Sequence, residues 1–143
     1  MIGDGKLGLL VAQVLVASGL AKVTLLGRHK SKMDLVEGLH RCVILNAHAT
    51  APSDSSHGSR GADVDPDPAL DPVSALEGTF PLVVEASGSS EGILTALRLT
   101  RPMGTLLLKS TVAVAPPGGV GGVQWAQVAN DLVVNEKTLV GSR

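Results

Sequence analysis

An α/β fold with one parallel β-sheet is predicted by three observations. Short runs of Val, Leu and Ile alternate with segments whose apolar residues recur at helical spacing, which is typical of parallel strands joined by helices. The 143 residues include one Phe, one Trp and no Tyr, so the core must be aliphatic, as in buried parallel sheets. A glycine-rich loop at residues 3–8 opens the first helical segment. Together these features predict a doubly wound parallel sheet with right-handed crossovers.

The first 45 residues are expected to contain two helices and two strands. The first helix follows the glycine loop, because apolar residues recur at helical spacing from Leu7 to Leu15. Gly19 is suited to a left-handed position that ends this helix. Ser31 is expected to be the N-cap of a second helix, with Asp34 three residues later completing a capping box. The two strands are expected at residues 22–26 and 42–45. Cys42, at the start of the second strand, is expected to be a small core residue and not a nucleophile.

Beyond residue 45 the composition changes and then returns to the earlier alternation. Residues 46–79 are expected to be a disordered surface segment, since 49–71 is rich in Ser, Pro, Asp, Gly and Ala. Its end, Pro72–Leu76, is expected to form a short helix. A later helix capped by Ser89 or Ser90 should end before Pro102. Further strands are expected at residues 82–86, 105–108, 132–134 and 138–140.

Composition excludes several classes of protein. The net charge of −1 and the scarcity of aromatic residues argue against binding to nucleic acid or to an anionic membrane. No apolar run reaches the ~18 residues of a membrane span. Cys42 is the only cysteine, so no intrachain disulfide can form and a reducing compartment, the cytoplasm, is expected. No Cys/His set has zinc spacing, so we expect no metal site in this chain.

The glycine loop is the strongest functional signal. In Gly3-Asp4-Gly5-Lys6-Leu7-Gly8 the first glycine permits a tight turn, the second lets a diphosphate approach the backbone, and the third lets the helix pack closely. The amides of Lys6 and Leu7 lie at a helix N-terminus, which favours an anion. The alternative is a plain strand-to-helix turn. The context predicts a Rossmann domain that binds a dinucleotide.

The loop after the second strand indicates which dinucleotide binds. NAD-binding domains carry an acidic residue there, about 20 residues beyond the glycines. This chain has Gly27 at that point, which leaves room for a 2′-phosphate, and Arg28 can grip that phosphate. His29, Lys30 and Lys32 add basic groups. NADP(H) is therefore predicted in preference to NAD(H), although a solvated basic loop would have the same composition.

Four stretches in this order resemble the cofactor-binding domain of the medium-chain dehydrogenase/reductases, the zinc alcohol dehydrogenase superfamily. They cover nearly the whole chain apart from residues 46–79, and they are Gly3–Gly8 with its helix, Val83–Ser89, Arg98–Leu106 and Leu132–Arg143. The resemblance implies hydride transfer between a nicotinamide and an alcohol or carbonyl in the intact enzyme. It also implies dimerisation through the C-terminal strands.

The resemblance implies further cofactor contacts along the edge of the sheet. Ser87 and Gly88 would lie near the adenosine-side ribose and the middle of the cofactor. Ser110 and Thr111 would flank the nicotinamide with Lys109, and Ser142 and Arg143 would meet its carboxamide. Glu85 could be catalytic, but a structural or ribose-contacting role is preferred. With the glycine loop and the basic loop, the predicted cofactor-binding residues are Gly3, Gly5, Lys6, Leu7, Gly8, Arg28, His29, Lys32, Ser87, Gly88, Ser110, Thr111, Ser142 and Arg143.

Two departures from the family define the alternatives. The family's zinc ligands and most of its substrate contacts belong to a preceding GroES-like catalytic domain that this sequence lacks, so we predict no catalytic residue here. Only Met1-Ile2 remain of the strand before the glycine loop, which is expected to leave two buried sheet edges without partners. A noncatalytic NADP(H)-binding or interaction module and a nonfunctional fragment stay open as alternatives. A methyltransferase that binds S-adenosylmethionine is less consistent with Gly27-Arg28-His29.

Overall fold

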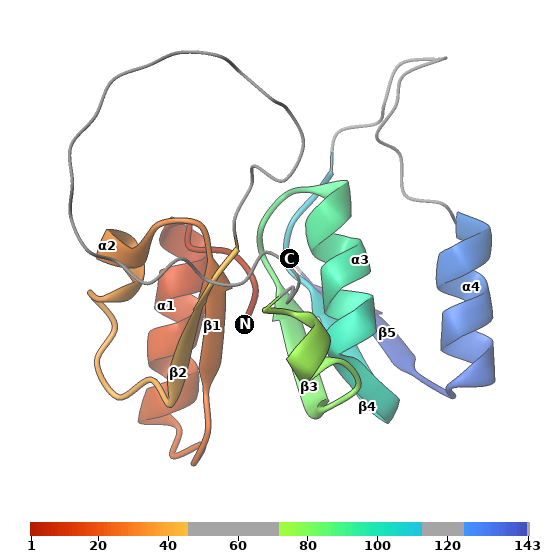
Figure 1. Cartoon of the computed structure of the whole chain (residues 1–143), viewed down its shortest axis with the longest axis horizontal. Coiled ribbons are helices and arrows are strands. Elements are labelled where there is room, and N and C mark those ends of the chain that lie inside the picture. The colour runs from red at the N-terminus through yellow and green to blue at the C-terminus, as the bar shows by residue number, and fades with distance from the viewer. Residues whose placement is uncertain (46–71, 113–124, 143) are drawn as a thin grey trace.

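The computed structural model describes residues 1–45, 72–112 and 125–142. These residues form an α/β fold with parallel strands, as predicted (Figure 1). The helices are α1 (Lys6–Ala17), α2 (Lys30–Met33), the 3₁₀ turn η1 (Ser74–Leu76), α3 (Ser90–Leu99) and α4 (Trp125–Val134). The strands are β1 (Thr24–Gly27), β2 (Arg41–Ile44), β3 (Phe80–Glu85), β4 (Thr100–Leu108) and β5 (Thr138–Gly141).

The strands have the order of a doubly wound nucleotide-binding sheet. β1 pairs with β2, and β3, β4 and β5 pair in that order, all of them in parallel. Ile2 forms parallel bridges to Leu26 of β1 and to Glu85 of β3, and so joins the two groups. With Met1–Gly3 in the central position the order becomes β2-β1-(1–3)-β3-β4-β5, which is the 3-2-1-4-5-6 order of Rossmann folds.

Residues 1–3 pair with both neighbouring strands, although the sequence predicted that these strands would lack partners there. On one side the amides of Leu26 and Gly3 donate to the carbonyls of Met1 and Leu26, each at 2.9 Å. On the other side the amide of Ile2 donates to Val84 at 2.8 Å, and Ala86 donates back to Ile2 at 2.9 Å. The expectation that both edges lack partners is therefore wrong next to the glycine loop, where extended backbone at Ile2 pairs with both neighbouring strands.

Each face of the sheet is covered by its own apolar cluster. One contains Ile2, Leu26, Val83 and Leu106 and is covered by residues of α3 and α4. The other contains Met1, Leu25 and Val84 and is covered by α1 and the α2 segment. Adjacent strand residues alternate between the clusters because side chains of a strand point alternately to its two faces. Helices on both faces confirm the predicted fold class.

Several local predictions are confirmed by the backbone. Gly19 has a φ of +79° just after the C-cap of α1, as the left-handed position requires. Ser89 is the N-cap of α3 and its hydroxyl accepts the amide of Gly92 at 3.0 Å. α3 ends at Leu99, before Pro102. Residues 138–140 lie in β5, as expected.

Other local predictions are wrong. Ser31 is not an N-cap, because α2 begins at Lys30 after His29 and ends at Met33, with Asp34 as its C-cap. Residues 132–134 are the last turn of α4 and not a strand, since the helix buries Val128 and packs on α3. Cys42 is exposed, because β2 pairs on only one side with another strand of the described residues.

The segment 46–79 is described from Pro72 onward. Val73 is buried in the core and Ser74–Leu76 forms the 3₁₀ turn η1, so the short helix expected at Pro72–Leu76 is present. Residues 72–79 thus depart from the expected disorder, because Val73 has a place in the apolar cluster. Residues 46–71 lie outside the described residues. Among the described helices, none has the length and apolar character needed to cross a membrane.

Candidate functional site

The glycine loop lies where the central Met1–Gly3 segment turns into α1. Gly3 has a φ of +106°, and a Cβ there would lie 2.7 Å from the carbonyl oxygen of Ala86. A Cβ on Gly8 would lie 2.0 Å from the carbonyl oxygen of Gly3. A Cβ on Gly5 would meet no atom within 4 Å. The loop is thus closed by backbone contacts at Gly3 and Gly8 and open at Gly5. The tight turn predicted at Gly3 and the close approach predicted at Gly8 are present, and the diphosphate expected at Gly5 stays a prediction.

The N-terminus of α1 has the chemistry of an anion site. The N-cap is Gly5, which offers no side chain to cap the helix, and the first turn contains no acidic residue. The first amides of a helix have no partner within the helix, and its dipole places partial positive charge there. Lys6 and Leu7, which carry the next amides, are exposed. A diphosphate therefore fits this end of the helix, next to the open space at Gly5.

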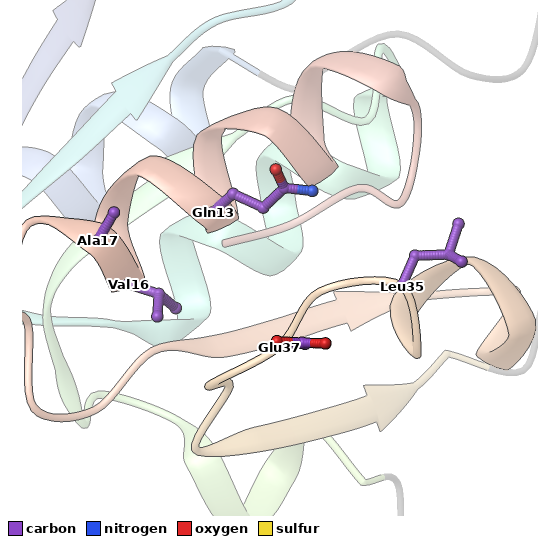
Figure 2. A pocket seen from close by; sticks show the side chains of 5 residues that line it. All are labelled: Gln13, Val16, Ala17, Leu35 and Glu37. Carbon is purple, nitrogen blue, oxygen red and sulfur yellow. The ribbon is translucent and has the colours of Figure 1, made fainter.

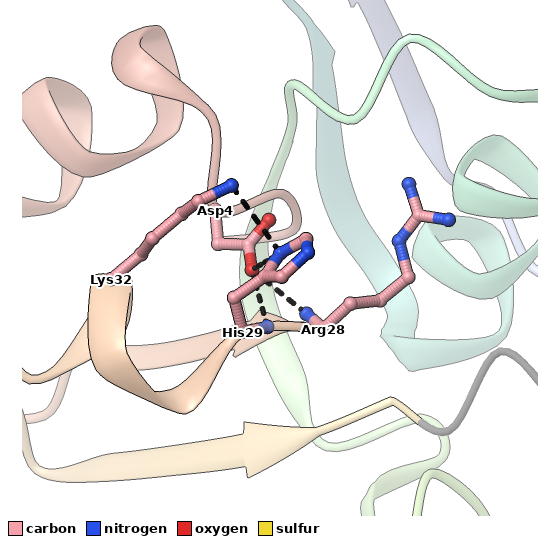
Figure 3. Close-up of polar contacts among 4 residues, drawn as sticks. All are labelled: Asp4, Arg28, His29 and Lys32. Carbon is pink, nitrogen blue, oxygen red and sulfur yellow. Dashed lines mark hydrogen bonds and ion pairs between the residues drawn. The ribbon is translucent and has the colours of Figure 1, made fainter.

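Basic residues follow β1 and surround one carboxylate (Figure 3). Oδ2 of Asp4 accepts the backbone amides of Arg28 and His29 at 2.9 and 2.6 Å. It also pairs with Nδ1 of the His29 ring at 2.8 Å. Nζ of Lys32 lies 3.4 Å from the same ring nitrogen, whereas the guanidinium of Arg28 extends away from Asp4. The structure therefore brings three of the predicted residues together around Asp4.

The environment of Asp4 stabilises its ionised form. Burial alone would raise the pKa of this carboxyl group. The hydrogen bonds from the His29 ring and from the amides of His29 and Arg28, together with the charge of His29, oppose it and hold the pKa below 3.8. Asp4 is therefore a carboxylate at neutral pH. It contributes stability that is lost as the pH falls through its lowered pKa.

Asp4 corrects one argument made from the sequence. Gly27 was expected to leave room for a phosphate, but a Cβ on Gly27 would lie 2.7 Å from Cβ of Asp4 and 2.9 Å from Sδ of Met33. The space beside Gly27 is therefore filled by Asp4 and Met33. An acid is also present at the end of β1, although it comes from the glycine loop. The signal that could have found it is an acidic residue between the first two glycines combined with a glycine after the second strand.

A second polar network holds the loops after β3 and β4. Oε1 of the fully buried Glu85 accepts the amide and the hydroxyl of Ser87, both at 2.5 Å. Oε2 accepts the hydroxyl of Ser110 at 2.5 Å, and that hydroxyl accepts the amide of Gly88 at 3.0 Å. Both oxygens of Glu85 are engaged with the protein, so its role in the structure is to position these loops. Ser87, Gly88 and Ser110 thus lie together at the ends of β3 and β4, and their contacts with a cofactor stay a prediction.

The remaining predicted residues lie at the carboxyl ends of β4 and β5. The hydroxyl of Ser142 accepts Nζ of Lys109 at 3.2 Å, and the amide of Ser142 donates to Leu108 at 3.0 Å. The carbonyl oxygen of Thr111 lies 3.9 Å from where a Cβ of Gly88 would be. Arg143 lies outside the described residues. The predicted residues that the structure describes therefore lie along one edge of the sheet, because the parallel strands all end there.

A shallow groove elsewhere has no polar site of this kind. It lies between the C-terminal half of α1 and the segment after α2, away from the glycine loop (Figure 2). Its lining residues are Gln13, Val16, Ala17, Leu35 and Glu37. Within residues 1–45, 72–112 and 125–142, no three His, Cys, Asp or Glu side chains gather as a metal ion would need. The glycine-loop edge is therefore the candidate site.

Comparison with known proteins shows which proteins share this fold. No family model matches the sequence. The chain is similar over 99% of its length to a zinc-binding dehydrogenase from Sinorhizobium meliloti bound to NADP (TM-score 0.64, 24% identity). It is also similar to Escherichia coli galactitol-1-phosphate dehydrogenase (0.67, 19%) and to Haloferax mediterranei glucose dehydrogenase in complex with NADP, zinc and gluconolactone (0.65, 21%). These likenesses show that the chain has the fold of a part of these dehydrogenases.

A sequence relative supports the same class. The chain is 44% identical over 70 residues to glucose 1-dehydrogenase 1 of Caldivirga maquilingensis, which is 49% of this chain and 19% of that protein. The chain covers 35% of each of the three solved structures just named. It thus spans about a third or less of the proteins that it matches. The predicted resemblance to zinc-type dehydrogenases is confirmed in the fold, and in sequence over those 70 residues.

Proposed function

We propose that this chain is the NADP(H)-binding unit of an alcohol-dehydrogenase-like oxidoreductase. The observation that carries the proposal is the open space at Gly5, between two glycines that backbone contacts close. A diphosphate lying there would accept the amides that open α1, in the position where dinucleotide-binding domains hold it. Gly3 and Gly8 shape the loop, and Lys6 adds a positive charge beside it.

The preference for NADP(H) is supported by the residues after β1 and by two solved structures. Arg28 has a guanidinium without a hydrogen bond or ion pair in the part of the chain that the structure describes, so it is available to a 2′-phosphate. His29 and Lys32 add polar groups from the same turn. The Sinorhizobium and Haloferax proteins of the same fold contain NADP. NAD(H), which lacks this phosphate, would gain nothing from Arg28.

The other predicted residues would position the rest of the cofactor. Ser87 and Gly88 would contact the ribose, and Ser110, Thr111, Ser142 and Arg143 would hold the nicotinamide. The bound cofactor would supply hydride exchange at C4 of its nicotinamide with an alcohol or carbonyl carbon. The residues of this chain bind and orient, whereas zinc and substrate belong to a separate domain of the intact enzyme.

The proposal extends to a homodimer and to a reducing compartment. β5 pairs with β4 and ends the described sheet, so its other edge can pair with β5 of a second copy in a homodimer. The exposed thiol of Cys42 suits a reducing compartment such as the cytoplasm.

Replacing Arg28 with Ala tests the cofactor preference. We expect the Kd of NADPH to rise at least about tenfold and that of NADH to change less than about twofold, because a charged hydrogen bond to phosphate is worth roughly 1.5–3 kcal/mol. Calorimetric titration of the full chain measures both. Arg101→Ala is the matched control, since Arg101 is an exposed cation near the opposite end of β4. Equal losses for the two nucleotides would refute the assignment of Arg28 to the phosphate.

A further inference from the structure

Asp4 joins two loops that are far apart in the sequence. It belongs to the glycine loop, yet its Oδ2 binds the amides of Arg28 and His29 and the ring of His29 at 2.6–2.9 Å. The residue is 8% exposed, and it is one of the few polar residues in the buried part of the chain that the structure describes. A carboxylate with three donors on one oxygen fixes the geometry of the turn that it binds.

Asp4 also limits which residue types fit at position 27. NAD-binding domains place an acidic side chain at the end of the second strand, where it accepts a ribose hydroxyl. In this chain the Cβ of such a residue at position 27 would lie 2.7 Å from Cβ and 2.9 Å from Cγ of Asp4. Asp4 therefore excludes an acidic side chain from that place, while its own Oδ2 is directed at backbone amides and at His29.

The His29 ring is fixed by one nitrogen and available through the other. Nδ1 pairs with Asp4, and Nε2 has no hydrogen bond to any described residue. The side chain is 51% exposed, so Nε2 can reach a ligand. The contact of Nδ1 with Asp4 fixes the orientation of the ring and leaves Nε2 outside that contact. The ring, the guanidinium of Arg28 and Nζ of Lys32 would then present three polar groups from one turn.

We propose that Asp4 is a positioning residue that sets the preference for the 2′-phosphate of NADP(H). It holds the turn at residues 28–29 and the His29 ring in the arrangement that receives the phosphate, and it keeps a competing acid out of position 27. This inference rests on the proposed function, because it assigns a role at the same nucleotide site.

Two effects of the Asp4 charge oppose one another. A carboxylate near a phosphate repels it, so loss of the charge could tighten NADPH binding. Three donors at 2.9 Å or less compensate the charge of Oδ2, and solvent screens what remains. Loss of the bond to Nδ1 frees the ring, so that a polar group with a fixed position is lost from the phosphate site. We therefore expect the positioning effect to exceed the repulsion, and the sign of the change in affinity decides between them.

The Asp4→Asn variant tests the proposal. Its amide oxygen can take the place of Oδ2 and still accept the backbone amides, but it carries no charge and therefore holds the ring Nδ1–H of His29 more weakly than the carboxylate does. We expect the Kd of NADPH to rise about tenfold and that of NADH to stay within about twofold, measured by calorimetry on the full chain. Asp34→Asn is the matched control, since it removes an exposed carboxylate that pairs with Lys30 at 2.8 Å, and it should leave both affinities unchanged.

A second variant keeps the test decisive if Asp4→Asn does not fold. His29→Gln retains the backbone amides that bind Asp4 and removes the imidazole, so it should lower the NADPH preference by a similar factor. If both variants fold, the double variant should lose little more than either single variant, because the two residues act through one contact.

The outcomes distinguish this inference from the proposed function. Failure of the unchanged chain to bind NADPH overturns the proposed function and this inference with it. An unchanged chain that binds NADPH, together with an Asp4→Asn variant that binds it equally well or more tightly, overturns only the role of Asp4.

Discussion

Replacing Gly5 with Asp is expected to abolish NADPH binding and to leave the fold intact. A Cβ at this position meets no atom within 4 Å, and the backbone there is extended with a φ of −74°, so an L residue fits. Asp is also a favourable N-cap and would stabilise α1. The same carboxylate would occupy the helix amides and repel the diphosphate. We expect the Kd of NADPH to rise more than about 100-fold, which corresponds to about 2.7 kcal/mol.

Thermal melting and calorimetry of the full chain test this prediction together. The melting temperature should stay the same or rise, while binding is lost. Gln13→Glu is the control, because it adds the same charge to an exposed position of α1 away from the loop. A Gly5→Asp variant that is folded and binds NADPH normally would show that the diphosphate does not lie at Gly5.

Replacing Gly8 with Ala is expected to destabilise the whole chain. The added Cβ would lie 2.0 Å from the carbonyl oxygen and 2.9 Å from the carbonyl carbon of Gly3. Both are backbone atoms of the turn, and they cannot move without separating the Met1–Gly3 segment from α1. We expect a loss of about 3 kcal/mol, which lowers the melting temperature by about 10 °C in a chain of this size. NADPH binding should weaken too, because the loop changes shape.

Gly5→Ala is the matched control for this second variant. It adds the same methyl group to the same loop, at a position with open space, and should melt within about 2 °C of the unchanged chain. If Gly8→Ala melts at the same temperature as Gly5→Ala, the close approach at Gly8 does not limit stability. The two alanine variants therefore separate a loop closed by packing from one that is merely rich in glycine.

Most of the fold could be predicted because its determinants are local. Aliphatic runs locate β1, β2, β3 and the later part of β4, and Gly19 and Ser89 locate two helix ends. The errors arise where tertiary contacts determine the secondary structure or the burial of a residue. Leu132-Val133-Val134 has the composition of a strand, but it completes a helix that begins at Trp125 and packs through Val128. Cys42 is exposed because of the position of β2 in the sheet, which its own sequence does not encode.

In the candidate site, too, only the features that are continuous in the sequence could be predicted. The glycine loop and the basic turn were found because each is continuous in the sequence. The contact between Asp4 and residues 28–29 spans 24 to 25 residues and depends on Met1–Gly3 lying beside β1. Glu85 could be noted at the end of a strand, but its bonds to Ser87 and Ser110 require β3 and β4 to be neighbours. Such contacts come from topology and not from spacing.

The most direct test of the nucleotide site is calorimetric titration of the unmodified 143-residue chain with NADPH and with NADH under identical conditions. The structure predicts one binding site per chain and an affinity for NADPH at least about tenfold higher than for NADH, since only NADPH carries the phosphate that Arg28 would bind. A folded chain that takes up neither nucleotide, or that prefers NADH, would contradict the proposed function.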